Sequence, residues 1–455
     1  MIGTLSQFAA ACGGELIGED RPFTEVAIDS RRLAAGELFA ALPGEHLDGH
    51  EFVADAAARG AAGAVVLRPL APEALPMPLA QIRVGNVGRA LATAARVART
   101  QFAGPVIGVG GSNGKTTVKE MTAAILSQRG PCLATRGNLN NHLGVPMTLL
   151  RLSPTHRSAV IEMGANRAGD IEQLMQMVLP DIGLVTNAGA EHLEGFGSLA
   201  GVARAEGEML AGLPPGGTAI INADDPYAPL WYASTCAQVV RFGLLNAAQF
   251  HAQGLRFMLD EHGFSTHFTL CTPPASAEVT LALAGRHNVL NALAAAAAAT
   301  SAGATLTEVV AGLGSMRAVK GRMQLRRSRS GAWLIDDSYN ANPSSVRAGL
   351  AALQELPGRR WMVLGDMAEL GAYAVDSHRE LGALARSLGV QRLYTFGPLA
   401  ALAADTFGAG AERFDDAGAL ARELTAALEP DTMLLIKGSR FNRLERLVDA
   451  LAVSA

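Results

Sequence analysis

Cysteine is scarce in this 455-residue sequence, and the few cysteines present are far apart. The four are Cys12, Cys132, Cys236 and Cys271. Because no pair has C-x-x-C spacing, the sequence offers neither a typical zinc site nor a disulfide framework. Such cysteine usage is typical of a reducing cytosol, where we expect the protein to work.

The sequence also lacks an excess of basic residues and a long hydrophobic run. Its net charge is −4, so no overall basic field would attract nucleic acid or anionic lipid. Alanine-rich stretches such as NALAAAAAATSAG predict a buried helix better than a membrane span. No basic segment precedes the apolar FAAA near the start, so we expect the mature chain to begin at Met1. We therefore expect a soluble protein, as a monomer, without integral membrane or nucleic-acid partners.

The order of apolar runs predicts an α/β fold with three domains, since a domain usually has roughly 100 to 200 residues. Residues 1–100 alternate short strands and helical patterns and predict a small α/β domain. Residues 101–314 contain the runs VIGVG, SAVIEMG, IGLVTNA and TAIINADD, which are apolar throughout, as buried parallel strands are. This pattern predicts a central, doubly wound, mostly parallel sheet, with antiparallel strands over 245–283 at its edge. Residues 315–455 form a further strand–helix series, which predicts a Rossmann-like C-terminal domain.

Lysine is also scarce, with four lysines against thirty-four arginines. Two of these lysines lie in IGVGGSNGKTTVKEM, residues 107–121. A strand, a glycine-rich turn and a helix in this order direct backbone N–H groups at one anion. Lys115 can reach terminal phosphates, and the Thr116 hydroxyl can bind Mg²⁺. The first glycine of the strict phosphate-loop pattern is replaced by Val109, and a turn that serves only packing is the alternative. We predict nucleotide binding by Gly111, Ser112, Asn113, Gly114, Lys115, Thr116 and Thr117, and we expect Lys119 on a solvated helix face.

GSNGKTT resembles the phosphate loop of the Mur ligases and of folylpolyglutamate synthases, which are ATP-dependent, amide-forming enzymes with three domains. The resemblance to the Mur ligase family covers most of the chain. It includes AIDSRRLAAGELFAALPGEHLDGHEFV, GNLNNHLGVPMTLL, NAGAEHLEGFGSLAGVARAEGEML, GRHNVLNALAA, IDDSYNANPSSV, VLGDMAELG and IKGSRFNRLE. It implies ATP and Mg²⁺ as cofactors, and joining of D-alanyl-D-alanine to UDP-N-acetylmuramoyl-tripeptide through an acyl phosphate. This is a step of peptidoglycan precursor synthesis.

A reaction between a carboxylate and a γ-phosphate needs cations, because both reactants are negative. By resemblance, Glu162 in IEMGAN and His192 in AEHLEGFG bind magnesium ions, with Thr116 on the ATP side. Without the glycine loop, an ordinary carboxylate at a strand end and a loop histidine would be the simpler interpretations.

Glu206 stands where most Mur ligases have a carbamylated lysine that helps to hold the second magnesium ion. No lysine lies between Lys119 and Lys320, and the guanidinium of Arg204 stays protonated, so it cannot take that modification. We hypothesise that Glu206 supplies the carboxylate directly. The alternative is that Glu206 is a solvated helix residue and that Glu208 or water takes its place.

The remaining candidates follow from the resemblance, and we expect them to contact the nucleotide or the substrates. Asn288 and Asn291, three apart on one helix face, are assigned to adenine. Arg322 and Asp337 are assigned to the γ-phosphate and the ribose, whereas we take Asp336 as a turn residue. Ser30 and Arg31 resemble residues that hold the UDP-sugar, and Asn138 and Asn141 could orient the sugar-peptide or the phosphate. Lys437, and with less support Ser439 and Arg440, could lie near the carboxylate of the dipeptide.

Other functions remain open at this point. The nearest is a Mur ligase that adds the diamino acid, which typically carries DNPR where this chain has NANPSS. Folylpolyglutamate synthase fits the N-terminal DSRR segment less well. A nucleotide-gated switch protein, which would need no amine substrate, is the alternative from another class. The residue that ends the tripeptide, lysine or meso-diaminopimelate, is not determined by the sequence.

Overall fold

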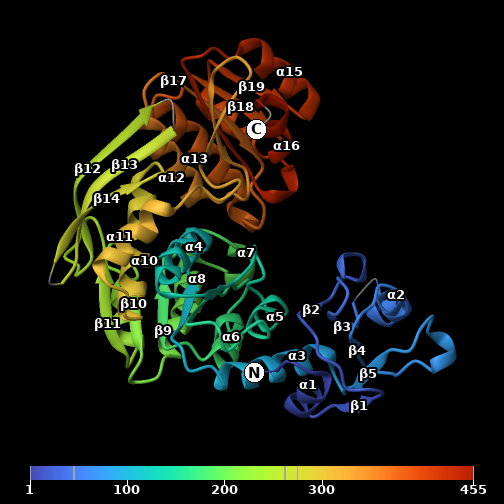
Figure 1. The fold of residues 1–455 in the computed structure, drawn as a ribbon. Helices are drawn as coiled ribbons and strands as arrows, with labels where there is room; N and C mark the ends of the chain where they lie inside the picture. The colour runs from blue at the N-terminus through green and yellow to red at the C-terminus, as the bar shows by residue number, and fades with distance from the viewer. Residues whose placement is uncertain (1, 45–46, 261–262, 274, 454–455) are drawn as a thin grey trace.

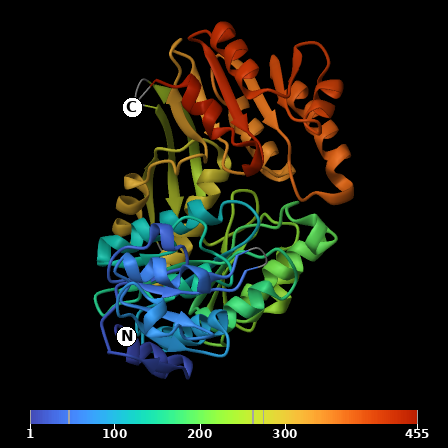
Figure 2. The same cartoon turned by 90° about the vertical axis from the view of Figure 1, so that its right-hand side faces the viewer.

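The computed structural model describes residues 2–44, 47–260, 263–273 and 275–453, and within them the strands form four sheets. We call residues up to 100 the N-terminal unit, residues 101–314 the central unit and the remainder the C-terminal unit. In two perpendicular views the C-terminal unit lies above the central unit, and the N-terminal unit lies beside the central one (Figures 1 and 2).

The N-terminal unit contains a five-stranded sheet of order β1-β5-β4-β3-β2, parallel except for β1. The strands are β1 (Glu15–Ile17), β2 (Val26–Ala27), β3 (Leu38–Ala40), β4 (Gly63–Val66) and β5 (Ala80–Arg83). The helices are α1 (Leu5–Cys12), α2 (Val53–Ala58) and α3 (Val87–Thr100), with short 3₁₀ turns at Ser30–Arg32, Gly49–Phe52 and Pro72–Ala74. Buried residues of α3 share one core with the central unit, so this helix joins the two units.

The central unit contains a six-stranded parallel sheet of order β11-β10-β9-β6-β8-β7. The strands are β6 (Val106–Gly110), β7 (Cys132–Ala134), β8 (Ser158–Glu162), β9 (Ile182–Val185), β10 (Thr218–Asn222) and β11 (Gln238–Phe242). The helices are α4 (Lys115–Leu126), α5 (Gly144–Leu149), α6 (Asp170–Val178), α7 (Leu193–Phe196), α8 (Leu199–Ala211), α9 (Ala228–Ser234), α10 (Arg286–Ser301) and α11 (Leu306–Ser315), with a 3₁₀ turn at Ser127–Arg129.

Both faces of this sheet are covered, as its all-apolar strands predict. Val106 and Ile161 point into the core shared with α5, α6 and α8, whereas Ile107 and Val160 point into the core of α4, α10 and α11. The doubly wound central sheet is confirmed.

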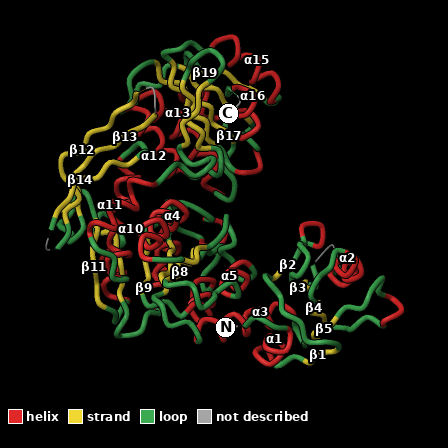
Figure 3. The backbone as a smooth tube through the Cα atoms, viewed as in Figure 1, coloured by secondary structure: helices red, strands yellow, loops and turns green. Residues whose placement is uncertain are grey.

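The predicted antiparallel strands exist, but they form a sheet of their own instead of extending the central one. The sheet has the order β12-β13-β14, with β12 (His251–Asp260), β13 (Gly263–Cys271) and β14 (Ser276–Leu281). Phe268 and Leu270 belong to the core of the central unit, whereas Phe264 belongs to that of the C-terminal unit. Figure 3 shows these strands running from one unit to the other.

The C-terminal unit contains a six-stranded sheet of order β15-β16-β20-β17-β18-β19, parallel except for β15. The strands are β15 (Gln324–Arg327), β16 (Trp333–Asp337), β17 (Arg359–Gly365), β18 (Arg392–Phe396), β19 (Ala411–Phe414) and β20 (Thr432–Lys437). The helices are α12 (Pro343–Gln354), α13 (Ala374–Ser387), α14 (Ala401–Phe407), α15 (Ala417–Ala427) and α16 (Glu445–Leu451), with 3₁₀ turns η5 (Gly371–Tyr373) and η6 (Arg440–Asn442).

Two predictions about single residues are wrong. Lys119 is not solvated: its side chain is 0% exposed, and its Nζ donates a hydrogen bond to Thr135 O at 2.7 Å. This side of α4 faces β7 and β8, so the sheet covers the lysine. Asp336 is not a turn residue but a buried part of β16, and it accepts a hydrogen bond from the Ser338 hydroxyl.

In the described part of the chain, no helix combines the length and the apolar character that crossing a membrane requires.

Candidate active site

The phosphate loop connects the end of β6 to the start of α4. Gly111 and Gly114 have φ values of 108° and 86°, a conformation that favours glycine. A Cβ on Gly111 would lie 2.2 Å from Thr186 Oγ1, and a Cβ on Gly114 would lie 2.4 Å from Asn291 Oδ1. No side chain caps the N-terminus of α4, so its first N–H groups remain available to an anion.

Lys115 folds back over this loop. Its Nζ donates hydrogen bonds to Ser112 O at 3.1 Å and to Glu191 Oε1 at 3.2 Å. Burial works against its ammonium group, but the nearby carboxylates of Glu191, Glu206 and Glu162 outweigh it and raise the pKa of Lys115. The loop therefore carries a fixed positive charge.

A cavity of about 510 Å³ opens at the loop, between the central and C-terminal units. It collects most of the predicted site residues. The central unit contributes residues 112–117 together with Asn138, Glu162, His192, Asn288 and Asn291. The C-terminal unit contributes Arg322, Asp337 and Lys437. Residues separated by more than three hundred positions thus line one space.

Glu162, at the end of β8, has a carboxylate suited to a metal ion. Its side chain is almost fully buried, and Asn140 Nδ2 donates a hydrogen bond to its Oε1 at 2.8 Å. Its Oε2 is buried and has no hydrogen-bond partner. A buried, unpaired carboxylate oxygen is costly unless a cation or a donor satisfies it. Magnesium prefers oxygen ligands, so this atom fits the predicted ion.

His192 precedes α7 and also lines the cavity. Its backbone has φ 47°, and its Nδ1 lies 2.6 Å from Glu369 Oε2 of the C-terminal unit. Among the described residues, no three His, Cys, Asp or Glu side chains are grouped closely enough to hold a metal ion. An ion at this site would consequently need further ligands from Thr116, the nucleotide phosphates or water.

Glu206 is not on the cavity wall. The residue is 1% exposed, and its carboxylate accepts a hydrogen bond from Gly111 N at 2.6 Å, beneath the phosphate loop. Burial, the largest cause, raises its pKa to about 7 despite the nearby Lys115 ammonium. It is therefore not a solvated helix residue, and its role as a metal ligand stays a prediction. Glu208, the alternative, accepts hydrogen bonds from Gly169 N and Glu172 N near the start of α6.

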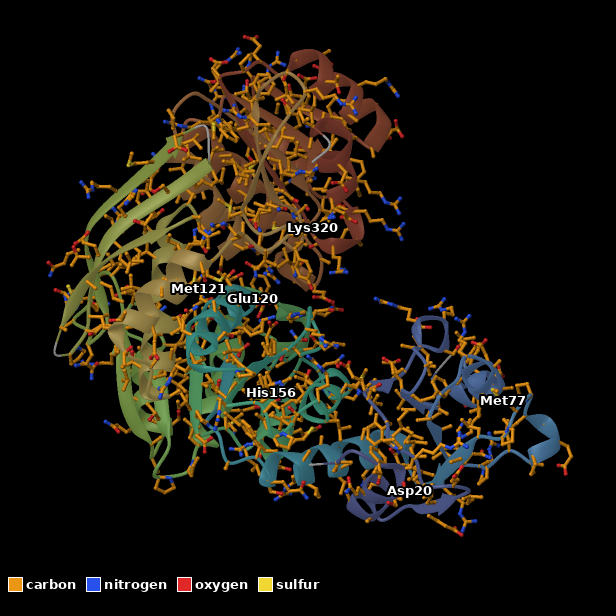
Figure 4. The ribbon with its side chains drawn as sticks, in the orientation of Figure 1. Asp20, Met77, Glu120, Met121, His156 and Lys320 are labelled. Atoms are coloured by element: carbon orange, nitrogen blue, oxygen red, sulfur yellow. The ribbon has the colours of Figure 1, made fainter. Side chains whose placement is uncertain are left out.

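The C-terminal unit reaches the loop through hydrogen bonds. Arg322 Nη2 donates to Thr116 Oγ1 at 3.0 Å, and Asn342 Nδ2 donates to Asn113 Oδ1 at 2.8 Å. The Arg322 guanidinium also stacks 4.2 Å from the ring centroid of Tyr339. Figure 4 labels Lys320, two residues earlier, above and to the right of Glu120 and Met121 of α4.

Asp337 and Lys437 form an ion pair of 2.6 Å across the neighbouring strands β16 and β20. Lys437 Nζ also donates to Asn340 O at 2.9 Å. The Lys437 side chain is 3% exposed, and its ammonium group holds the Asp337 carboxylate in the cavity wall. Ser439 and Arg440 lie beyond that wall, and Arg440 contributes to a second cavity with Lys320.

Asn288 and Asn291 lie on one face of α10, as their spacing predicts. Asn291 Nδ2 donates to Asn288 Oδ1 at 3.2 Å, and Asn288 Nδ2 donates to Ala284 O. The two amides thus form a short polar chain beside Gly114.

Three predicted substrate residues lie outside the cavity. Asn141 Oδ1 accepts hydrogen bonds from Leu143 N and Gly144 N at the start of α5. Ser30 is buried in the N-terminal unit, and Arg31 is mostly exposed and paired with Asp29.

Sequence reasoning missed Asn140, Glu191, Asn342 and Glu369, although each belongs to a stretch used for the resemblance. Each of them touches a predicted site residue through a side-chain contact. Two of them could have been found as chain neighbours of predicted residues, because Asn140 precedes Asn141 and Glu191 precedes His192.

Three family descriptions match this chain: Mur ligase family, catalytic domain, over residues 22–99; Mur ligase middle domain over 109–299; and Mur ligase, glutamate ligase domain, over 321–440. An Escherichia coli (strain K12) protein named UDP-N-acetylmuramoyl-tripeptide--D-alanyl-D-alanine ligase is 44% identical over 450 residues, 98% of each chain. A protein of that name from Mycobacterium tuberculosis (strain ATCC 25618 / H37Rv) is 37% identical, covering 98% of this chain and 97% of its own length.

Solved structures of proteins with related names have the same fold as this chain. A crystal structure of MurF from Acinetobacter baumannii superposes with a TM-score of 0.88 at 35% identity, covering 98% of this chain and 97% of that one. The structure of MurF ligase from Thermotoga maritima in complex with ADP has a TM-score of 0.81 at 26% identity, covering 94% and 96%. This chain belongs to the Mur ligase family.

Proposed function

We propose that this chain joins D-alanyl-D-alanine to UDP-N-acetylmuramoyl-tripeptide with ATP as the energy source, in peptidoglycan precursor synthesis. The observation that carries the proposal is the cavity in which the phosphate loop, the free Glu162 oxygen and Arg322 meet. The names and full-length similarity of the relatives support the choice of substrates.

The chemistry has two steps. A carboxylate oxygen of the tripeptide attacks the γ-phosphorus of ATP, the bond to the β,γ-bridging oxygen breaks, and ADP leaves. The amine of the dipeptide then attacks the acyl carbon, loses a proton and expels inorganic phosphate. Both steps concentrate negative charge, which fixed cations and hydrogen-bond donors stabilise.

ATP would lie with its phosphates at residues 111–117 and its base toward Asn288 and Asn291. Lys115 is charged and already directed at the loop. Arg322 would move from Thr116 to the γ-phosphate, and Asp337, held by Lys437, would meet the ribose. These assignments are supported by the position of every named side chain on the cavity wall.

Magnesium would be held by Glu162, His192 and the Thr116 hydroxyl, with phosphate oxygens completing the set. When bound, it offsets the repulsion between the carboxylate and the phosphates. The buried Glu162 Oε2 supports this assignment most directly. We propose Glu206 as a further ligand that would reach the ion through Oε1, because its Oε2 accepts the hydrogen bond from Gly111 N.

The UDP-sugar would be held by the N-terminal unit, through Ser30 and Arg31, with Asn138 orienting its peptide. Two ion pairs, from Glu25 to Arg136 and to Arg151, tie this unit to the segment that carries Asn138.

We propose domain limits near residues 100 and 314. We propose that the chain acts as a monomer, in the cytoplasm where a reducing environment suits its free thiols.

The test is ADP release from ATP with UDP-N-acetylmuramoyl-tripeptides ending in lysine or in meso-diaminopimelate, with and without D-alanyl-D-alanine. We expect sustained release only with the dipeptide present, and a stoichiometric pentapeptide product. Steady release that is independent of both co-substrates would favour a nucleotide switch and contradict the proposal.

A further inference from the structure

Two residues with strained backbones contact each other across the boundary between the central and C-terminal units. In the described part of the chain, five residues other than glycine have a positive φ, and His192 (47°) and Glu369 (62°) are two of them. The left-handed conformation brings the Cβ of a non-glycine residue too close to the following carbonyl oxygen, so it is strained. Such strain persists only where surrounding contacts impose it, and it is often found at functional sites.

The contact between the two residues is close. His192 Nδ1 lies 2.6 Å from Glu369 Oε2, and Glu194 N donates a hydrogen bond to Glu369 O. Leu193, which lies between His192 and Glu194 in the chain, is 7% exposed and belongs to the core of the C-terminal unit. The segment around Glu369 therefore receives the start of α7 through an apolar residue and two polar contacts.

These contacts fix the imidazole ring on two sides. Its Nδ1 is held by the Glu369 carboxylate, and its ring packs in a T-shaped arrangement with the Phe196 ring, with 6.5 Å between ring centroids. Nε2 is the remaining ring nitrogen, on a residue that lines the cavity. A carboxylate on one ring nitrogen sets both the tautomer and the orientation of a histidine that binds a metal through the other.

The contact between His192 and Glu369 is too exposed to contribute much to the stability of the fold. The Glu369 side chain is 57% exposed. A contact with a carboxylate that is this exposed to solvent contributes little to stability. The contact therefore matters more for the orientation of the His192 ring than for the stability of the fold.

We infer that Glu369 is a positioning residue: it holds His192 so that Nε2 faces the ion and phosphate site. The inference rests on the proposed function, in which His192 binds the metal. Its consequence is that the metal site, which lies on the central unit, is complete only while the C-terminal unit is docked against α7.

The experiment measures the affinity of Mn²⁺, a spectroscopic substitute for Mg²⁺, for the full chain with saturating ADP, by electron paramagnetic resonance. The variants are Glu369→Ala, Glu369→Gln and His192→Ala. Glu380→Ala is the matched control, because Glu380 is exposed, belongs to the same unit and is paired only with Arg347 among the described contacts. Melting temperatures establish that each variant is folded.

We expect Glu369→Ala to weaken Mn²⁺ binding about tenfold, as loss of an outer partner of a metal ligand does. Glu369→Gln keeps an oxygen acceptor for Nδ1–H and should stay within about threefold of the unchanged chain. Glu380→Ala should bind Mn²⁺ normally.

Two results would overturn the inference, and they are distinguishable. If His192→Ala weakens Mn²⁺ binding but Glu369→Ala leaves it unchanged, Glu369 does not position the histidine, and the proposed function stands. If neither substitution changes the affinity, His192 is not a metal ligand, and that part of the proposed function fails together with the inference.

Discussion

Arg322 Nη2 donates a hydrogen bond to Thr116 Oγ1 at 3.0 Å, so a guanidinium from the C-terminal unit reaches the first turn of the phosphate-loop helix. The hydroxyl that it contacts is a proposed ligand of magnesium. ATP and its metal would displace the arginine from Thr116, and the guanidinium would then be free to bind the γ-phosphate with two parallel N–H donors.

Replacement of Arg322 should therefore affect turnover. We expect Arg322→Ala to lower kcat about 100-fold or more, the usual effect of removing a donor to the charge of a transition state. Arg322→Lys keeps the charge but loses the planar fork and the stacking on Tyr339, so it should restore only part of the rate. Rates of ADP release give the answer. Arg317→Ala is the control, since Arg317 bonds only to nearby carbonyls among the described contacts, and an equal loss there would argue against a specific role.

Glu162→Gln removes the charge of the proposed metal ligand while preserving its shape. We expect the Mg²⁺ concentration for half-maximal activity to rise and kcat to fall at least about 100-fold, because an amide is a weaker ligand. Asn140 could still donate to the amide oxygen, so the melting temperature should change little. A magnesium titration of ADP release measures both effects. Turnover within threefold of the unchanged chain would contradict the assignment.

Glu206 should make the stability of the fold depend on pH. Its pKa is raised by burial from 4.5 to about 7, so between these values the folded state binds more protons than the unfolded state. Stability therefore falls as pH rises through this window, and the loss is complete above about pH 7. Glu206→Gln cannot ionise, still accepts from Gly111 N, and leaves Lys115 paired with Glu191.

We expect Glu206→Gln to be more stable than the unchanged chain at pH 8, by at most about 3 kcal/mol, and to converge with it toward pH 5. Urea unfolding at the two pH values checks this, with exposed Glu380→Gln as a control. A stability difference that is the same at pH 5 and pH 8 would show that Glu206 does not titrate in this range.

Lys119→Met should destabilise the fold without removing ATP binding. Lys119 is fully buried, and Thr135, whose carbonyl it contacts, accepts a hydrogen bond from Glu162 N through its hydroxyl. Loss of the buried donor leaves the carbonyl unsatisfied, which costs about 1 to 3 kcal/mol. The same change at exposed Lys320 should cost under about 0.5 kcal/mol. Urea unfolding of both variants decides; equal stabilities would mean that Thr135 O finds another donor.

Much of the fold was predictable because its signals are local. All-apolar strands are typical of a sheet covered on both faces, and the Gly-Lys-Thr turn between a strand and a helix predicts an anion site. The burial of Lys119 was not predictable in this way, since it depends on which side of α4 packs on β7 and β8. The separate three-stranded sheet likewise depends on contacts with two cores.

In the candidate site, too, some contacts depend on packing that local sequence signals do not determine. Asn140 and Asn141 are neighbours of identical chemistry, but Asn141 accepts hydrogen bonds from the backbone at the start of α5, which leaves Asn140 to reach Glu162. Sequence spacing cannot separate the two. Glu369 was also beyond sequence reasoning, because its contact with His192 arises only when the C-terminal unit packs on α7.

In the proposed reaction, a tripeptide carboxylate is activated by phosphoryl transfer in this cavity. The most direct test uses UDP-N-acetylmuramoyl-tripeptide with both oxygens of the reacting carboxylate labelled as ¹⁸O, and mass spectrometry of the inorganic phosphate released with D-alanyl-D-alanine. We expect one ¹⁸O in each phosphate and one retained in the new amide. Phosphate that contains no ¹⁸O would contradict it.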